Sequence, residues 1–316
     1  MKVMFLVLLL AVSAQKAPGG ESGDTLRVMF WNLENFFDWR NDSTSVSDAE
    51  FSSRGPRRWT RKRFQAKADA IAKSILWMAG REGGLPDVIG FAEVENAFVL
   101  RCLLHGTVLR KLDYQIIHFD SPDPRGIDVA LLYRKSRLHL AGARAFPLLQ
   151  ADTVLRTREI LLVQMQEGVA FLVNHHPSKF GGAAVSGPRR SIAVERLCFL
   201  ADSVQADVSK VIAMGDFNDT PDNPVYGRLS PGLRNLALPL HKRGEGTIKY
   251  QGKWELIDHF YITEGTWLSQ MKVIHIPFLT VLDKAFSGEK PLRTYAGPRY
   301  LGGVSDHCPI WLTVIE

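Results

Sequence analysis

Six short segments of the chain each place acidic, amide or imidazole side chains at the end of an apolar, strand-like run. They are WNLEN (31–35), FAEVEN (91–96), VNHHPSK (173–179), GDFND (215–219), IDHFY (257–261) and SDHCP (305–309). Together they supply oxygen ligands for a divalent cation, imidazoles in two separate places, and amides that can hold an anion. Metal-assisted hydrolysis of a phosphate ester requires these groups.

The first candidate metal ligand is Glu93, which follows the apolar run 88–91. Carboxylate oxygen is the natural ligand for Mg²⁺, which keeps several waters and is completed by substrate phosphate. Glu95 competes for this role, because it would share a face with Glu93 if the strand continued. A lone glutamate in this place is usually a surface charge, and the other five segments favour the ligand.

Asp216 and Asn218 alternate along an extended segment, so their side chains point to the same side. A carboxylate in this place can orient or deprotonate the attacking water, while the amide can hydrogen-bond a phosphate oxygen. Asn32 follows the run 26–31 in a similar way, and its amide also suits a metal or a phosphate. Turn formation is the alternative for both asparagines.

Adjacent imidazoles, His175 and His176, end the run 169–174, and only one of them can face the same side as the other groups. Zinc is the rival ligand, but this spacing does not match common zinc sites. The hard oxygen ligands favour magnesium, manganese or calcium.

The segment before the last strand carries Asp306 and His307, which can reach one site only from an irregular rim, since adjacent strand residues point oppositely. Asp258 suits an imidazolium partner, because a carboxylate fixes the ring's tautomer and raises its pKa. A purely structural carboxylate–imidazole pair is the alternative. For Cys308, which begins the terminal strand, we expect buried packing rather than nucleophilic chemistry.

The elements that must position these groups are short strands interleaved with two long helices. One helix begins after Thr60, with Phe64, Ala68 and Ile71 at helical spacing, and a second covers 188–203 with Pro188 in its first turn. The expected strands are 26–31, 88–92, 114–119, 128–133, 159–165, 169–174, 211–214, 256–262 and 310–314. Hairpin-like strand pairs are common, which favours an α+β fold with mixed sheets covered by helices.

The chain begins with a segment typical of export. Lys2 and an apolar run precede Val12-Ser13-Ala14, so residues 1–14 are expected to be a signal peptide and 15–24 a mobile lead-in. Residues 25–316 then form a single domain, with no later run of eighteen apolar residues to insert stably in a membrane. Three cysteines are too few for a disulfide framework. We expect a monomer that is secreted or periplasmic.

The charge distribution is compatible with a polyanionic partner. The formal net charge is +6, and six of the ten residues from Arg54 to Arg63 are basic. A solvated loop leading into a helix is the alternative for this basic run.

Read in order, WNLEN, FAEVEN, GDFND, IDHFY and SDHCPI resemble the motifs of the endonuclease/exonuclease/phosphatase superfamily over 26–316. The resemblance implies a four-layer α/β/β/α sandwich of two stacked mixed sheets flanked by helices. It implies that Asn32, Glu93 and Asp306 line a Mg²⁺ or Mn²⁺ site, with Ca²⁺ as an alternative. It also gives Asp216 the water-activating role and Asn218 the amide that holds it and the phosphate.

The same resemblance makes His307 the imidazole that stabilises the pentacovalent phosphate, oriented by Asp258. It selects His175 over His176 as the other imidazole. The stretch RGIDVALLYR is similar to a family segment that supplies a basic residue and an acidic partner for the first histidine, which are here Arg125 and Asp128.

The resulting hypothesis is an exported, divalent-metal-dependent phosphodiesterase, most simply a nuclease without strong sequence preference, since cutting at phosphates needs no base reading. A phosphatase or lipid phosphodiesterase on the same fold is the first alternative, because a fold does not set the substrate. A secreted binding protein without turnover is the second.

Overall fold

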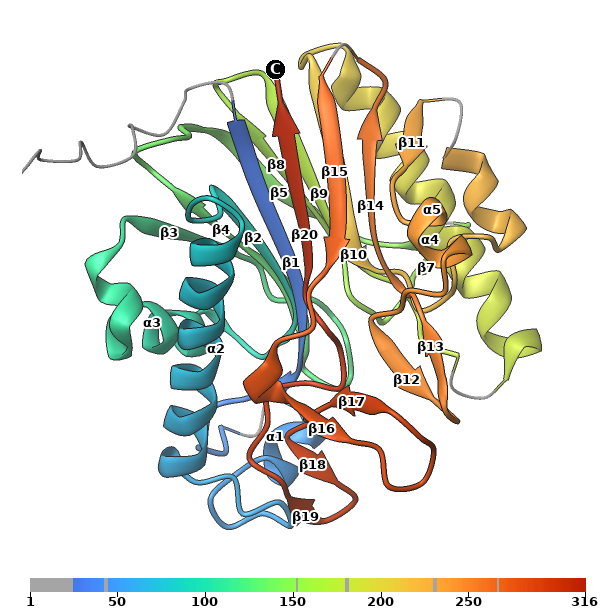
Figure 1. Ribbon diagram of the computed structural model, residues 1–316. Coiled ribbons are helices and arrows are strands. Elements are labelled where there is room, and N and C mark those ends of the chain that lie inside the picture. The colour runs from blue at the N-terminus through green and yellow to red at the C-terminus, as the bar shows by residue number, and fades with distance from the viewer. Residues whose placement is uncertain (1–24, 43–44, 152, 180–181, 230–231, 266) are drawn as a thin grey trace, which may run out of the picture.

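Two six-stranded mixed sheets pack face to face between two layers of helices (Figure 1). The computed structural model describes residues 25–316 except 43–44, 152, 180–181, 230–231 and 266. The expected signal peptide and lead-in, residues 1–24, lie outside the described residues. The four-layer α+β sandwich is confirmed.

The first sheet has the order β15-β20-β1-β2-β4-β3 and the second β11-β14-β10-β9-β8-β5. The first sheet consists of β1 (Thr25–Phe36), β2 (Val88–Val94), β3 (Tyr114–His118), β4 (Asp128–Arg134), β15 (Leu268–Val273) and β20 (Ile310–Ile315). The second consists of β5 (Leu140–Phe146), β8 (Ile160–Met165), β9 (Val169–His175), β10 (Lys210–Asp216), β11 (Leu233–Asn235) and β14 (Asp258–Thr263). In each sheet one parallel pair, β1 with β2 or β9 with β10, lies among antiparallel neighbours.

Alternate residues of the central strands form the core between the sheets. Val28 and Phe30 of β1 face Phe171 and Val173 of β9 and their neighbours across this core. A side chain at Gly90 of β2 would lie 2.9 Å from the sulfur of Met214 in the opposite sheet. The absence of a side chain there lets the two sheets approach closely.

Helices cover the outer face of each sheet. The long helix α2 (Arg61–Arg81) packs its apolar stripe on the first sheet together with α3 (Ala97–Gly106). Its first turn is capped by Thr60, whose hydroxyl accepts a hydrogen bond from the Arg63 amide, and the helix begins after Thr60 as predicted. On the other side, α4 (Ala183–Gln205) packs on the second sheet.

The remaining elements are short and decorate the rims of the sandwich. They are α1 (Val46–Glu50), η1 (Val108–Lys111), β6 (Leu149–Gln150), β7 (Thr153–Val154), η2 (Pro224–Leu229), α5 (Leu238–Lys242), β12 (Ile248–Tyr250), β13 (Lys253–Glu255), η3 (Pro277–Leu279), β16 (Thr280–Leu282), β17 (Glu289–Pro291), β18 (Tyr295–Ala296) and β19 (Arg299–Tyr300).

Two expectations about local structure need correction. The second long helix begins at Ala183 rather than 188, so Pro188 lies inside it, near enough to the N-terminus to cost only one early hydrogen bond. The basic run is only partly solvated, because Arg57 and Arg63 lie over the rings of Tyr295 and Tyr300 at 5.1 and 4.4 Å. Arg57 ties the loop before α2, and Arg63 the first turn of that helix, to the β18–β19 hairpin.

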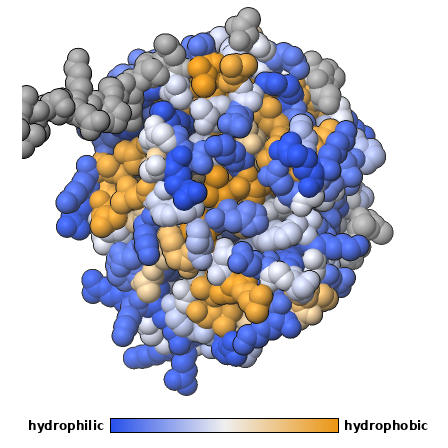
Figure 2. Space-filling view, in the orientation of Figure 1, coloured by the Kyte–Doolittle hydropathy of each residue, from blue (hydrophilic) through white to orange (hydrophobic). Residues whose placement is uncertain are grey.

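The helices, the surface and the cysteines bear on the expectations from the sequence. Among the described helices, none has the length and apolar character that crossing a membrane requires. On the face drawn in Figure 2, apolar areas are interrupted by polar residues. The three cysteines are unpaired, and Cys308 is 5% exposed, which confirms its packing role.

Candidate active site

Three neighbouring strands of the second sheet place a histidine and two aspartates side by side. In the strand register Asp216 of β10 lies opposite His175 of β9 on one side and Asp258 of β14 on the other. Paired residues share a face of the sheet. That face is the inward one, because each residue continues the alternate apolar row of its strand, such as Ile212 and Met214 before Asp216.

The first sheet contributes from the same end of the sandwich. Asn32 continues the inward row of β1, and its Nδ2 donates to Asp216 Oδ2 at 3.0 Å. His307 stands in the irregular segment before β20, as predicted, where Trp31 Nε1 donates to its carbonyl at 2.8 Å. The hydroxyl of Ser305 fixes this segment, because it donates to the Asn32 carbonyl and accepts from the His307 amide.

Asp216 Oδ2 is the point on which these side chains converge. Besides Asn32, the Nε2 atoms of His175 and His307 lie 3.6 and 3.8 Å from it. The other oxygen, Oδ1, accepts the backbone amide of Asn218 at 2.8 Å. The structure therefore brings His175, Asp216, Asp258, His307 and Asn32 together, from both sheets.

The two imidazoles are pushed to opposite protonation states. Burial of His307 opposes a charge on its ring. The carboxylates of Asp258 and Asp216 outweigh this effect and raise the pKa of His307 well above its usual value. The Asp258 Oδ2 atom lies 2.8 Å from His307 Nδ1. Burial, with the positive charges of Arg158 and Arg125, lowers the pKa of His175 well below it. Such a divergence marks a charged donor and a neutral ring in one site.

Burial also raises the pKa of Asp216 to about 7, while the charge of His307 opposes the rise and that of Asp258 adds to it. A carboxylate whose pKa lies near neutral pH is suited to accept a proton from water. The groups around Asp216 Oδ2 can therefore accept a proton and donate hydrogen bonds to a phosphoryl group placed beside them.

His176 takes no part in this constellation. Its ring packs 4.6 Å from that of Phe217 in a buried cluster with Tyr226 and His259. Neither ring nitrogen has a hydrogen-bond partner among the described residues. Geometry thus separates His175, which faces Asp216, from its neighbour.

The predicted metal-site carboxylates lie beside the cluster, each held by an arginine. Arg125 Nη2 lies 3.3 Å from Glu93 Oε1 and donates to Asn35 Oδ1 at 2.7 Å. Arg293 Nη2 lies 3.0 Å from Asp306 Oδ2. Among the contacts described, none joins Asn32, Glu93 and Asp306 directly. Glu95 accepts the Asp38 amide instead, so it is separated from Glu93.

Three residues near these carboxylates escaped the sequence argument. Glu34 pairs with Arg293 at 2.8 Å, and the buried Lys67 donates to the Glu34 carbonyl and the Thr294 hydroxyl, both at 2.8 Å. Burial and the charge of Asp306 raise the pKa of Glu34 to about 7. Two features of the sequence could have identified two of them: Glu34 lies two residues after Asn32, and Lys67 interrupts the apolar stripe of α2.

The donor set fits a hard divalent cation. Glu34, Glu93 and Asp306 all act electrostatically on both Lys67 and Arg293, so the three carboxylates surround one region. They offer only oxygen ligands, which Mg²⁺, Mn²⁺ and Ca²⁺ prefer. The ligand atoms of Asp216, Asp258 and His307 also lie within 4.8 Å of one another, but His307 there already contacts both carboxylates, Asp258 at 2.8 Å and Asp216 at 3.8 Å.

Two assignments differ from the geometry. Asp128 was expected beside the first catalytic histidine, but its carboxylate contacts His118 Nε2 at 3.1 Å and accepts from Ser121. The reason is that Asp128 begins β4, next to β3, which ends at His118. The Asn218 amide donates to the His176 carbonyl at 2.9 Å rather than facing Asp216, whose carboxylate is held by the Asn218 backbone.

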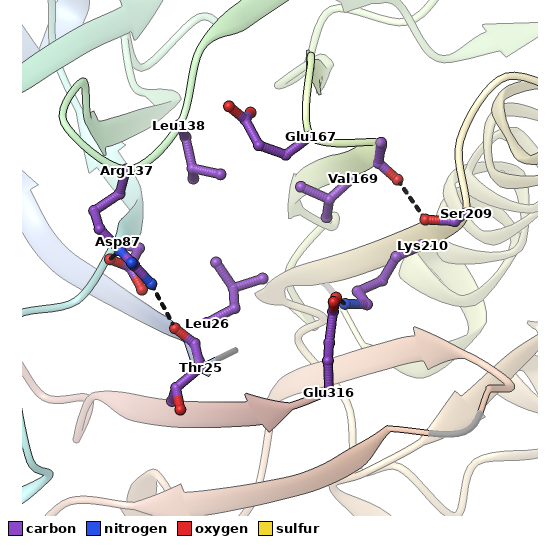
Figure 3. A pocket seen from close by; sticks show the side chains of 11 residues that line it. Thr25, Leu26, Asp87, Arg137, Leu138, Glu167, Val169, Ser209, Lys210 and Glu316 are labelled. Carbon is purple, nitrogen blue, oxygen red and sulfur yellow. Dashed lines mark hydrogen bonds and ion pairs between the residues drawn. The ribbon is translucent and has the colours of Figure 1, made fainter. Parts of the chain in front are cut away.

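A cavity of about 270 Å³ lies at the opposite end of the strands (Figure 3). Its charged groups already have partners: Arg137 lies 3.0 Å from Asp87, Lys210 pairs with Glu316, and Glu167 lies 2.8 Å from His139. The convergent groups that could do chemistry are at the other end.

Comparison with known proteins agrees with this geometry. A model of the Endonuclease/Exonuclease/phosphatase family matches residues 27–316. A comparison with curated proteins finds no match. The fold is similar to that of humanized D. rerio TDP2 (15% identity, 93% of this chain and 100% of that chain, TM-score 0.59).

Two further solved structures share the fold. One is D. rerio TDP2 complexed with single-strand DNA product, at 15% identity over 92% of this chain and 99% of that one, with a TM-score of 0.57. The other is the human Nocturnin catalytic domain with bound sulfate anion, at 16% identity over 92% and 94%, also with a TM-score of 0.57.

Proposed function

Because the chain belongs to the endonuclease/exonuclease/phosphatase family of phosphodiester hydrolases, we propose that it is an exported nuclease that depends on a divalent metal. The observation that carries the proposal is the convergence of His175, His307 and Asn32 on Asp216 Oδ2. A proton acceptor there lies among donors able to hold a phosphoryl oxygen.

The roles follow from the contacts. Asp216 accepts the proton of the attacking water, and Asn32 holds the carboxylate in place through its 3.0 Å hydrogen bond. His307, kept charged by Asp258, donates to the phosphoryl oxygens as negative charge develops on them. The neutral His175 offers a second, uncharged donor.

Glu93, Glu34 and Asp306 are the residues that would hold the cation. When bound, a divalent ion polarises a phosphoryl oxygen and neutralises developing charge. Arg125 and Arg293 hold these carboxylates in the present structure and shield them from one another.

Nucleic acid is the favoured substrate class. The positive net charge, the basic run from Arg54 to Arg63 and the expected export signal support this choice. The similar fold of D. rerio TDP2, whose solved structure holds single-strand DNA product, agrees with it. A phosphatase or lipid phosphodiesterase remains the alternative, because Arg54, Arg58 and Lys62 would suit a polyphosphate head group too.

The direct test is plasmid nicking by the purified mature protein in Mg²⁺ or Mn²⁺. We expect nicking to stop with chelator and to be lost in Asp216→Ala and His307→Ala variants whose thermal unfolding is unchanged. Chelator-resistant cleavage by both variants would contradict the proposal. A parallel panel of DNA, RNA, sphingomyelin and inositol phosphates identifies the substrate, and steep salt dependence indicates a long polyanion.

A further inference from the structure

A second cavity, of about 450 Å³, opens between the loop before β4, the residues before β8, the segment after β9 and the start of α4. Four arginines line it: Arg125, Arg156, Arg158 and Arg189. Asp123 is the one carboxylate among the described lining residues. The apolar part of the wall, Leu155 and two prolines, leaves room for an uncharged group beside an anion.

Two of the four arginines in this arginine pocket have no acidic partner among the described residues, whereas Arg125 pairs with Glu93 and Arg158 with Asp123. The Asp123 carboxylate is taken by Arg158, whose Nη1 lies 2.9 Å from it, and by the Arg125 backbone amide at 2.8 Å. Arg156 and Arg189 are exposed and form no hydrogen bond or ion pair within the described part of the chain. The buried Arg158 also leaves its Nε without a partner there.

The arginine pocket adjoins the reaction centre through two direct contacts. Arg125, on its wall, also contacts Glu93 at 3.3 Å. Arg158 donates to the carbonyl of His176 at 2.7 Å, next to His175, and Pro177 after it lines the pocket. A group held among the arginines would therefore lie beside a phosphate held at Asp216 and His307.

Resting on the function proposed above, we propose that this pocket binds a second phosphate of the nucleic-acid substrate, next to the scissile one. Guanidinium groups match phosphate oxygens through paired, charge-assisted hydrogen bonds. The volume falls in the range of sites for small ligands, so the sugar of the same nucleotide fits with its phosphate. Ser186 and Arg189, in the first two turns of α4, place the positive end of that helix at the pocket.

The test compares two dinucleotides that share one internal phosphodiester, of which one carries an added 5′-phosphate. Their binding to the mature protein is measured by calorimetry in EDTA, where the site is not turning over. We expect the added phosphate to tighten binding at least tenfold. The Arg156→Gln/Arg189→Gln double variant should lose this advantage. The control, Arg101→Gln/Arg110→Gln, removes the same charge from α3 and η1 on the other sheet and should keep it.

Equal affinity for both dinucleotides, or an advantage that survives in the double variant, would overturn the subsite. Inorganic phosphate alone is a second arm: if it binds as tightly, with the same arginine dependence, the pocket takes free phosphate and not a substrate phosphate. Tighter binding of an inositol polyphosphate than of the phosphorylated dinucleotide would also overturn the nucleic-acid assignment. Loss of plasmid nicking with intact arginine-dependent binding would instead refute the nuclease activity alone.

Discussion

At the scale of single residues, the proposed reaction depends on the difference between two imidazoles that lie within 4 Å of one carboxylate oxygen. His307 is charged because it lies between Asp216 and Asp258, and His175 is neutral because it is buried near arginines. In the environment of His175, the His307 ring would lose its charge, and in the environment of His307, the His175 ring would gain one. In the proposed reaction, the pairing of His307 with Asp258 is therefore a contact whose loss we expect to slow turnover.

We expect Asp258→Asn to reduce kcat at least a hundredfold with little change in KM, because a mispositioned, uncharged imidazole loses a contact that strengthens only as the phosphate reacts. Steady-state kinetics on the identified substrate measure both constants. Asp128→Asn is the matched control, since it disrupts a similarly buried carboxylate–imidazole pair with His118. If the control variant lost as much kcat, the role given to Asp258 would be wrong.

At the scale of elements, the register of β9, β10 and β14 is what aligns the site. Gly215 lies next to Asp216 in β10, and a side chain there would come within 2.2 Å of the Asn174 carbonyl in β9. The two parallel strands therefore approach one another only with glycine at this position. This close approach of β9 and β10 places His175 Nε2 3.6 Å from Asp216 Oδ2.

Gly215→Ala should destabilise the protein by about 2 kcal/mol or more, or prevent folding, because strand β10 must shift away from β9. Urea unfolding measures the change. Gly187→Ala, inside α4 with open space around it, should instead stabilise by about 0.5–1 kcal/mol. Equal behaviour of the two variants would show that the close approach of the strands is relieved elsewhere.

Much of this arrangement was predictable because strand residues alternate. Asp216 follows the apolar run of its strand, so its place at a sheet end could be read from the sequence. Arg293 could not, because it lies in a long irregular stretch of small hairpins whose path no periodicity encodes. The assignment of Asp128 differs from the structure for another reason: the neighbouring strand β3 supplies His118, which contacts the Asp128 carboxylate.

At the scale of the whole molecule, two buried histidines make the fold sensitive to acid. Burial lowers the pKa of His176 and His259 to about 3, against an ordinary 6.5. Between these values the unfolded chain binds protons that the folded chain does not, so stability falls as the pH drops below about 6.5. Buried carboxylates such as Glu95, with a raised pKa, act in the opposite direction.

His176→Leu isolates the histidine contribution, because neither nitrogen of this ring has a described partner. Between pH 7 and pH 5 the wild-type protein should lose roughly 2 kcal/mol more unfolding free energy than the variant. Denaturant titrations at the two pH values measure this difference. His105→Gln, an exposed ring on α3, should behave like the wild type; parallel losses in wild type and His176→Leu would contradict the assignment.

Export is the second prediction at this scale. The small residues at Val12-Ser13-Ala14 predict cleavage after Ala14, so the mature chain should begin at Gln15. Mass spectrometry of the protein recovered outside the cytoplasm identifies that end. Ala14→Asp should leave the precursor uncut, and an intact Met1 terminus on recovered wild-type protein would refute the signal.

The reaction centre is divided between two sheets: Asn32 and His307 arrive from one, His175, Asp216 and Asp258 from the other. Neither half holds a working set of groups by itself. The constellation is therefore complete only once both sheets have formed and packed face to face, so a chain with one sheet unfolded lacks part of it.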